Sequence, residues 1–87
     1  MKITDVEIIK LDTVNKLTGV ASIVIDDSFI IKGIKIINGV NGLFIAMPSK
    51  KDSNGEFYDI AHPINSSTRE MIQKAVLDKY NLMEGEN

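Results

Sequence analysis

Residues 20–47, VASIVIDDSFIIKGIKIINGVNGLFIAM, decide the fold, because three apolar runs alternate there with two short polar turns. The runs are rich in valine and isoleucine, whose β-branched side chains favour extended strands. The second turn, NGVNG, is a strong hairpin signal. Short turns join antiparallel neighbours, since parallel strands need a long crossover. The stretch therefore predicts an antiparallel meander with strands at 20–25, 29–37 and 43–47.

The flanking sequence adds a strand on either side of this meander and then a helix. The runs 3–11 and 56–60 have strand-like patterns, and a loop at 49–55 leads to the second of them. Ser67 and Glu70 have the spacing of a capping box at a helix start. The apolar residues that follow recur at nearly helical spacing: Ile72, Val76, Tyr80 and Met83. We therefore expect an α+β fold, an antiparallel meander of about five strands with one C-terminal helix of about four turns.

The predicted strands are apolar on both faces, which indicates a second cover besides the helix. Alternation in the run 29–37 separates Phe29, Ile31 and Ile37 from Ile30, Ile34 and Ile36, and in the run 20–25 it separates Ile23 and Ile25 from Val20 and Val24. A sheet covered on one face by a helix would normally be polar on the other. Small domains that lack disulfides and structural metals often enlarge their hydrophobic core by self-association. We therefore expect a homodimer.

Length and composition define the broad class of protein. A chain of 87 residues suits one domain, to which we assign residues 1–84, with a short acidic tail at 85–87. The sequence has no cysteine, which excludes disulfides, thiol catalysis and cysteine zinc sites. Charges near the N-terminus interrupt any signal-peptide core, and the apolar runs are shorter than the about 20 residues of a membrane span. We expect a soluble, cytoplasmic protein with no membrane partner.

The residues give little support to catalysis or to metal binding. His62 is the only histidine, which excludes a histidine-rich metal site. A catalytic set could be assembled from Ser49, Ser66 or Ser67 with His62 and Asp59, but no nucleophile-elbow pattern surrounds these serines. His62 precedes a proline, and its ring could bond a nearby backbone group instead. We expect no enzyme activity, no metal, no cofactor and no small-molecule substrate.

The charge pattern favours a polyanion as the partner. The net charge is −2, yet residues 32–51 hold four lysines and no acidic residue. Lys50 and Lys51 fall in the predicted loop, where long cations can reach phosphates. Arg69 falls at the helix start, which attracts anions through its free amide groups. The neighbouring Asn65, Ser66 and Thr68 could touch phosphates or base edges. The alternatives are that the lysines are only solvated, that the polar residues only cap the helix, and that Arg69 pairs with Asp59 or another acid.

The sequence resembles the SpoVG family of bacteria, the stage V sporulation protein G or septation regulator family. The resemblance is carried by NGLFIAMPSKKDSNGEFYDIAHPINSSTRE at 41–70, and most specifically by GLFIAMPSK followed by HPIN. The segments ITDVEI, ASIVIDDSFII and IQKAVLDKY are also similar, so the resemblance covers essentially the whole chain. It implies a small dimeric fold with a β-sheet and a C-terminal helix. It also implies a cytoplasmic regulator that binds DNA, and in some cases RNA, and that influences genes of sporulation and septation.

The resemblance also suggests a binding site, with two departures from the family pattern. It assigns nucleic-acid binding to Lys50 and Lys51, and to Ser66, Ser67, Thr68 and Arg69 at the helix start. Family members often carry arginine at the position of Lys51 and a basic residue at the position of Tyr58. Lysine lacks the planar fork of arginine, and a tyrosine ring could stack on a base. The alternative function is a protein-interaction module of the division or sporulation machinery that binds nucleic acid only weakly.

Overall fold

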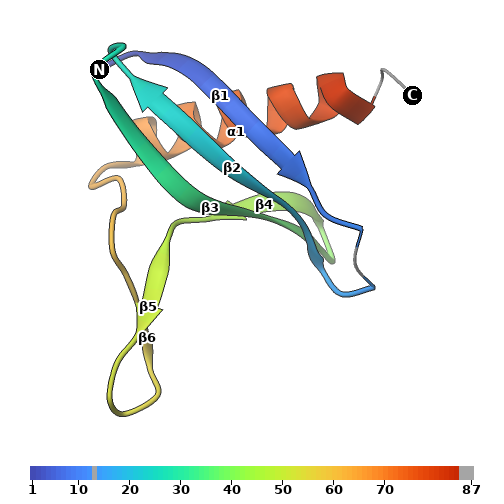
Figure 1. Cartoon of the computed structure of the whole chain (residues 1–87), viewed down its shortest axis with the longest axis vertical. Coiled ribbons are helices and arrows are strands. Elements are labelled where there is room, and N and C mark those ends of the chain that lie inside the picture. The colour runs from blue at the N-terminus through green and yellow to red at the C-terminus, as the bar shows by residue number, and fades with distance from the viewer. Residues whose placement is uncertain (13, 85–87) are drawn as a thin grey trace.

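The computed structural model describes residues 1–12 and 14–84, apart from the side chain of Glu84 (Figure 1). The described elements are β1 (Ile3–Lys10), β2 (Leu17–Ile25), β3 (Phe29–Gly39), β4 (Gly42–Ala46), β5 (Ser49–Lys51), β6 (Phe57–Asp59) and α1 (Ser66–Glu84). Strands precede the single described helix, which confirms the predicted α+β class. The predicted acidic tail at 85–87 lies outside the described residues.

The first four strands form one antiparallel sheet in the order β1-β2-β3-β4, which confirms the predicted meander. The turn between β2 and β3 shows why the chain reverses so tightly. Asp26 and Asp27 have φ angles of 53° and 55°, in the left-handed region that aspartate adopts more readily than most residues. The Ser28 amide donates to the carbonyl of Ile25 at 2.9 Å and closes the turn.

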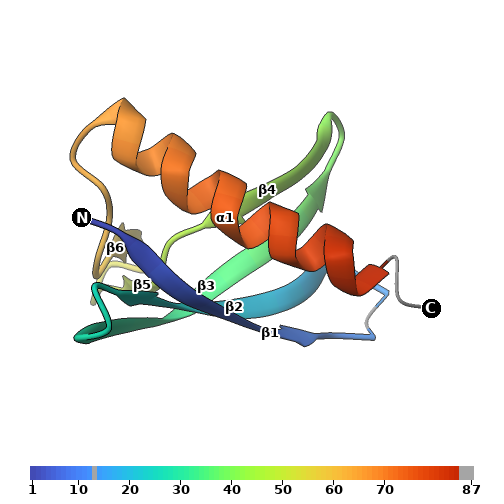
Figure 2. The same cartoon turned by 90° about the horizontal axis from the view of Figure 1, so that it is seen from above.

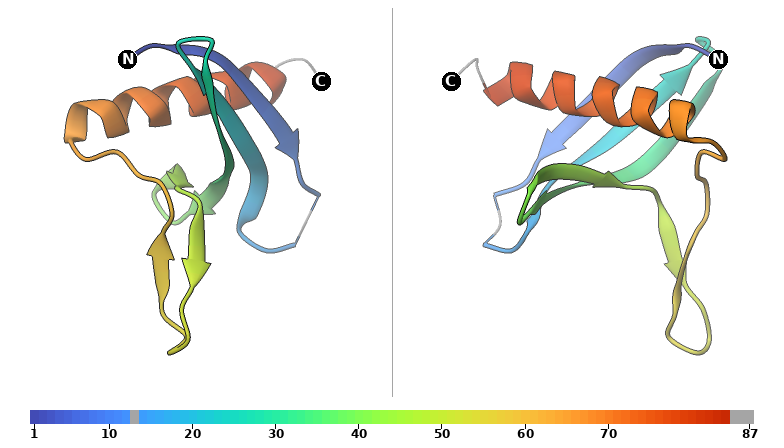
Figure 3. Two further views of the ribbon diagram at one scale, coloured as in Figure 1. Left: turned by 60° about the vertical axis from the view of Figure 1, so that its left-hand side comes forward. Right: turned by 180° about the vertical axis from the view of Figure 1, so that it is seen from behind.

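The predicted fifth strand does not join this sheet, and the predicted loop at 49–55 is partly a strand. β6 pairs with β5 in a separate two-stranded antiparallel sheet. We call residues 49–59 the ribbon; it projects away from the sheet and the helix (Figures 1 and 3). A tight turn joins β5 to β6, so β6 finds its backbone partners a few residues upstream. Sequence alternation identified the strand but not its partner.

Gly33 changes which residues of β3 face the helix. The register between β2 and β3 shifts there, so that β3 has one more residue than β2 over the same length. Gly33 takes up the extra residue with a φ of 83°, which glycine adopts without strain. Ile31 therefore packs against the same core as Ile34 and Ile36. The predicted grouping of Ile31 on the opposite face is wrong, because strict alternation fails across a bulge.

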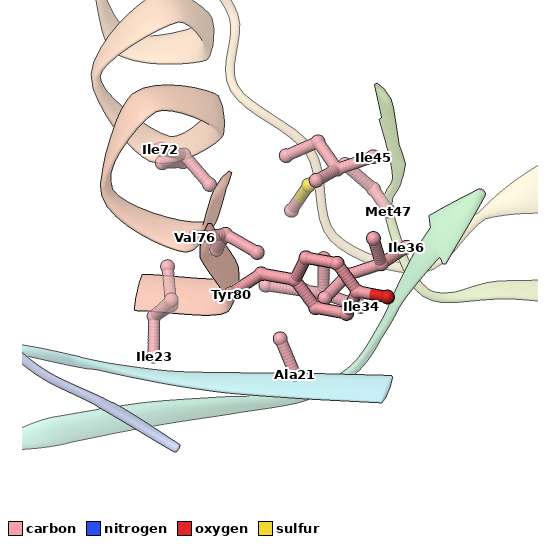
Figure 4. Close-up of a cluster of buried hydrophobic side chains, with 9 residues drawn as sticks. All are labelled: Ala21, Ile23, Ile34, Ile36, Ile45, Met47, Ile72, Val76 and Tyr80. Carbon is pink, nitrogen blue, oxygen red and sulfur yellow. The ribbon is translucent and has the colours of Figure 1, made fainter. Parts of the chain in front are cut away.

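The hydrophobic core lies between α1 and the face of the sheet that it crosses (Figures 2 and 4). Its buried members are Ala21, Ile23, Ile34, Ile36, Ile45, Met47, Ile72, Val76 and Tyr80. The predicted helical spacing is confirmed, since the three helix residues of this core come one turn apart. The helix has 19 residues, about five turns, and is therefore longer than predicted. Among the described residues, no helix is long and apolar enough to span a membrane.

The opposite face of the sheet, which we call the outer face, has no cover from any described segment (Figure 1). The strand register places there Asp5, Glu7 and Ile9 of β1, Val20, Ser22 and Val24 of β2, Ile30, Lys35 and Ile37 of β3, and Phe44 and Ala46 of β4. Ile9, Ile30 and Phe44 are 69%, 45% and 43% exposed. The sheet is thus apolar on both faces, as predicted, although Gly33 changes the membership of each face.

Candidate functional site

The ribbon owes its shape to a turn that Asp52 organises. The Asp52 amide donates to the Glu56 carbonyl at 2.8 Å, and the Gly55 amide donates to the Asp52 carbonyl at 3.1 Å. The Asp52 carboxylate also accepts from the amides of Asn54 and Glu56, each at 2.9 Å. Gly55 has a φ of 85°, the usual conformation at the end of a three-residue hairpin loop. The Asp52 charge is therefore directed at the amides of the turn.

Each lysine of the ribbon lies opposite an aromatic residue. Lys50 pairs with Tyr58 and Lys51 pairs with Phe57 across the two strands. The Lys51 Nζ atom lies 5.7 Å from the centroid of the Phe57 ring. Both lysines are exposed and form no salt bridge with any described residue. The rings are also open to solvent, with Phe57 70% and Tyr58 50% exposed. The predicted lysines therefore lie on a strand with aromatic neighbours, and not on a plain loop.

Asn65, and not Ser67, caps the start of α1. The Asn65 Oδ1 atom accepts from the Thr68 amide at 2.8 Å, and the Asn65 carbonyl accepts from the Arg69 amide at 3.2 Å. Ser67 is already inside the helix, and its hydroxyl donates to Asn65 Oδ1 at 3.0 Å. The predicted capping box of Ser67 and Glu70 is therefore wrong. The helix begins earlier because Asn65 is as good a cap as serine and comes two residues earlier in the chain.

The remaining helix-start residues are placed differently from one another. Ser66, Ser67 and Arg69 are exposed, whereas Thr68 is half-buried. Ser66 and Arg69 border a hollow of about 460 Å³ that also includes His62, Pro63, Ile64 and Asn65. The first turn holds no acidic residue, and Arg69 forms no salt bridge with Asp59 or another described acid. The Arg69 guanidinium is therefore available to an anion. Thr68 is less accessible to a ligand, because it is half-buried.

The structure does not bring the two halves of the predicted site into one patch. The ribbon projects away from the body, and the segment that follows it leads back to the helix start, which lies well apart from the ribbon (Figures 1 and 3). The Ile60 amide donates to the Pro48 carbonyl at 2.7 Å, which closes the base of the ribbon. One chain thus has two separate cationic sites: Lys50 and Lys51 on the ribbon, and Arg69 at the start of α1.

The residues considered for catalysis are not assembled. The Nδ1–H of His62 donates to the Pro63 carbonyl at 3.0 Å, which confirms that its ring bonds a nearby backbone group. Across residues 1–12 and 14–84, no hydrogen bond joins His62 to Asp59 or to any of the serines Ser49, Ser66 and Ser67. The same part of the chain contains no group of three histidine or acidic residues that could hold a metal ion.

Phe57 is the residue that sequence reasoning missed. The pattern at 56–60 predicts that Phe57 belongs to a strand of the main sheet. In that sheet its ring would have no role in binding. The useful signal was local, because DSNG between the runs SKK and EFY is typical of a hairpin that pairs those runs with each other. With that pairing, each aromatic residue falls opposite a lysine.

These features define a small α+β protein in which one helix covers a four-stranded meander and a lysine–aromatic ribbon projects from it. The chain belongs to the SpoVG family, a family related to sporulation and septation, because the family's sequence model matches residues 1–82. The resemblance seen in the sequence is thereby confirmed.

Similar proteins from several bacteria are each named "Putative septation protein SpoVG". The protein of Clostridium novyi is 52% identical over 86 residues, covering 99% of this chain and 86% of the relative. That of Caldanaerobacter subterraneus is 52% identical over 87 residues, covering 100% and 96%. That of Agathobacter rectalis is 56% identical over 80 residues, covering 92% of both chains.

Proposed function

We propose that this protein is a non-enzymatic, cytoplasmic regulator of gene expression that binds DNA and also RNA. The observation that carries the proposal is the exposed pair Lys50 and Lys51, whose ammonium groups have no acidic partner among the described residues. Arg69 adds a cation at a helix start without acidic residues in its first turn. The septation name of the relatives supports a role in sporulation and cell-division septation. The proposal needs no metal, cofactor, membrane or small-molecule substrate.

Phosphate contacts would supply most of the affinity. Lysine and arginine side chains bind phosphate oxygens, and each contact releases counterions, so that binding weakens as salt rises. Polar groups at Ser66 and Ser67 lie beside Arg69 and would adjust sequence preference through hydroxyl contacts to bases. Thr68, which is half-buried, would act mainly by holding the helix start in place.

A second copy of the chain would cover the outer face. Its centre is apolar, and its charges are separated: Asp5 and Glu7 lie on β1, whereas Lys35 lies on β3. A twofold axis parallel to β2 would place β1 of one copy over β3 of its partner. The register then leaves Glu7 two residues, about 7 Å, along the strands from Lys35 of the partner subunit, a distance that the long lysine side chain can span. Burial of the apolar centre would drive this dimerisation, and the charges would fix its orientation. A dimer would also have twice as many cationic sites as a single chain.

The test is fluorescence anisotropy of labelled duplex DNA, single-stranded DNA and RNA over a salt series. The variant Lys50→Ala/Lys51→Ala/Arg69→Ala should bind more weakly and show a shallower salt dependence, by about 0.9 per lost duplex contact in the log–log slope. A folded triple variant that binds as tightly as the parent contradicts the proposal.

A matched control separates local contacts from overall charge. The variant Lys2→Ala/Lys16→Ala/Lys79→Ala removes the same number of exposed cations elsewhere on the chain and should bind nearly as the parent does. Lys74 is unsuitable for this control, because its Nζ atom lies 2.8 Å from Asp78 and the hydrogen bond raises the pKa of Lys74. Equal losses in both triple variants would indicate a nonspecific charge effect.

The alternative candidate is a protein-interaction module of the division or sporulation machinery. The observation that favours it is the exposed apolar outer face, together with the net charge of −2. Partners recovered from cells that survive nuclease treatment, and that are lost when the outer face is altered, would favour this alternative. Partners that disappear with nuclease would favour nucleic-acid binding.

A further inference from the structure

We infer that the ribbon binds single-stranded nucleic acid, with unpaired bases stacked on Phe57 and Tyr58 and the adjacent phosphates held by Lys51 and Lys50. This inference rests on the proposed function and specifies which form of nucleic acid the ribbon takes. It adds stacking on the two rings to the phosphate contacts that the proposed function assigns to the lysines.

The strand register supplies one ring and one ammonium group on each face of the ribbon. Directly opposed residues of an antiparallel pair point to the same face, and successive residues alternate. Lys51 and Phe57 therefore share one face, and Lys50 and Tyr58 share the other. The Lys51 Nζ atom lies over the Phe57 ring, 5.7 Å from its centroid and within the range of a cation–π contact, so a base would stack on the opposite face of the ring. Each face thus carries the two groups that a base and its phosphate need.

The rings are free to stack because the ribbon stands outside the core. Phe57 and Tyr58 are 70% and 50% exposed, and neither belongs to the core cluster or packs against it. Large aromatic side chains gain free energy when they are covered, so two open rings on a projecting element indicate a ligand with flat apolar faces. Nucleobases have such faces, and stacking on aromatic residues is tolerant of sequence.

Single strands fit this arrangement better than a duplex does. The bases of a duplex are already stacked on one another, and only their edges are open in the grooves. Stacking on the ribbon would therefore require a base to leave the duplex, which costs a few kcal/mol. An unpaired strand can offer its bases without that cost.

The charge of the ribbon points the same way. Its two lysines are outnumbered by Asp52, Glu56 and Asp59, so the ribbon as a whole attracts phosphates only weakly. Two lysine contacts on a single strand would give a log–log salt slope of at most about −1.4 per chain. Tight binding by the ribbon with so shallow a slope requires a contribution that salt does not screen, and stacking is such a contribution.

The experiment compares a labelled oligothymidylate with a labelled duplex across a salt series, using Phe57→Ala, Tyr58→Ala and Tyr58→Phe. Each alanine variant should weaken oligothymidylate binding about fivefold or more and leave the salt slope unchanged. Tyr58→Phe should bind as the parent does, because it keeps the ring. Phe29→Ala is the matched control, since Phe29 is 65% exposed but lies outside the ribbon. Duplex binding should change little in all four variants.

A second readout detects the stacking itself. The fluorescence of 2-aminopurine within the oligothymidylate should change on binding to the parent and to Tyr58→Phe, and the change should be reduced in the alanine variants. Size-exclusion chromatography of each variant shows whether the rings serve self-association instead.

The outcomes separate this inference from the proposed function. If the alanine variants bind oligothymidylate as the parent does while the lysine variants bind weakly, the inference is wrong and the proposed function stands. If the alanine variants become monomeric, the rings belong to an interface between copies, and the inference is again wrong. If the parent binds neither the oligothymidylate nor the duplex at low salt, both fail.

Discussion

Asn65 determines where α1 begins, although the sequence suggested Ser67 for that role. The Asn65 side chain accepts from the Thr68 amide at 2.8 Å, whereas the Ser67 hydroxyl donates to Asn65. Replacement of a cap by alanine costs about 0.5–2 kcal/mol. We therefore expect Asn65→Ala to lower the free energy of unfolding, measured in urea, by about 1 kcal/mol.

Ser67→Ala is the natural comparison for this prediction. It removes a hydroxyl that supports the cap but leaves the bond between Asn65 and the Thr68 amide in place, so its effect should be the smaller of the two. A larger loss of stability in Ser67→Ala than in Asn65→Ala would contradict Asn65 as the cap and would favour the capping box of Ser67 and Glu70. Two candidates that lie two residues apart and have nearly equal cap preference cannot be ranked from sequence.

At the scale of elements, the ribbon is the least supported part of the fold. Isolated two-stranded hairpins are marginally stable in water, and none of the core residues comes from β5 or β6. We expect the amides of Lys51 and Tyr58 to exchange with deuterium much faster than those of Ile23 and Ile34, by at least about a hundredfold in a domain of ordinary stability. Hydrogen exchange followed by NMR measures this difference.

Two controls make the exchange experiment informative. Dilution of the protein should leave exchange of the ribbon amides fast, and addition of an oligothymidylate should slow it. Ribbon amides as protected as the core, in the free protein and at every concentration, would show that the ribbon is packed against the body and would contradict its exposed position.

The elements differ in how well the sequence predicts them, and the reason is the range of the interactions that define them. The meander at residues 20–47 was predictable because each strand pairs with the next across a short turn. The face of Ile31 was not, since one extra residue at Gly33 reverses the alternation. The partner of β6 was missed because the sequence offered two pairings, and only the turn built by Asp52 selects the local one. Likewise, no pattern in the chain showed that the ribbon and Arg69 would lie apart.

At the scale of the whole molecule, the outer face is an apolar surface that no described segment covers. If two copies meet through the outer face, as proposed, Val24→Glu should convert that dimer to a monomer, because it places a charge in the apolar centre next to Asp5. Burial of an unpaired charge costs several kcal/mol, so the dimer Kd should rise by more than about a hundredfold. Sedimentation equilibrium measures the Kd.

Val40→Glu is the control, because the Val40 side chain is exposed at the β3–β4 turn, and it should leave the dimer Kd unchanged. A monomeric parent, or equal dimers in both variants, would reject this interface.

The charges on the outer face allow a sharper test of how the two copies are oriented. With the proposed twofold axis parallel to β2, Lys35→Glu would place an acid about 7 Å along the strands from Glu7 of the partner subunit, and symmetry would repeat that approach. Each exposed pair contributes up to about 1 kcal/mol, so the single variant should weaken the dimer by about tenfold. Glu7→Lys should weaken the dimer similarly, by bringing two cations together.

The double variant restores opposite charges and should recover most of the parent's Kd, as measured by sedimentation equilibrium at low salt. If the two losses simply add in the double variant, Glu7 and Lys35 do not meet, and the copies pack in another orientation.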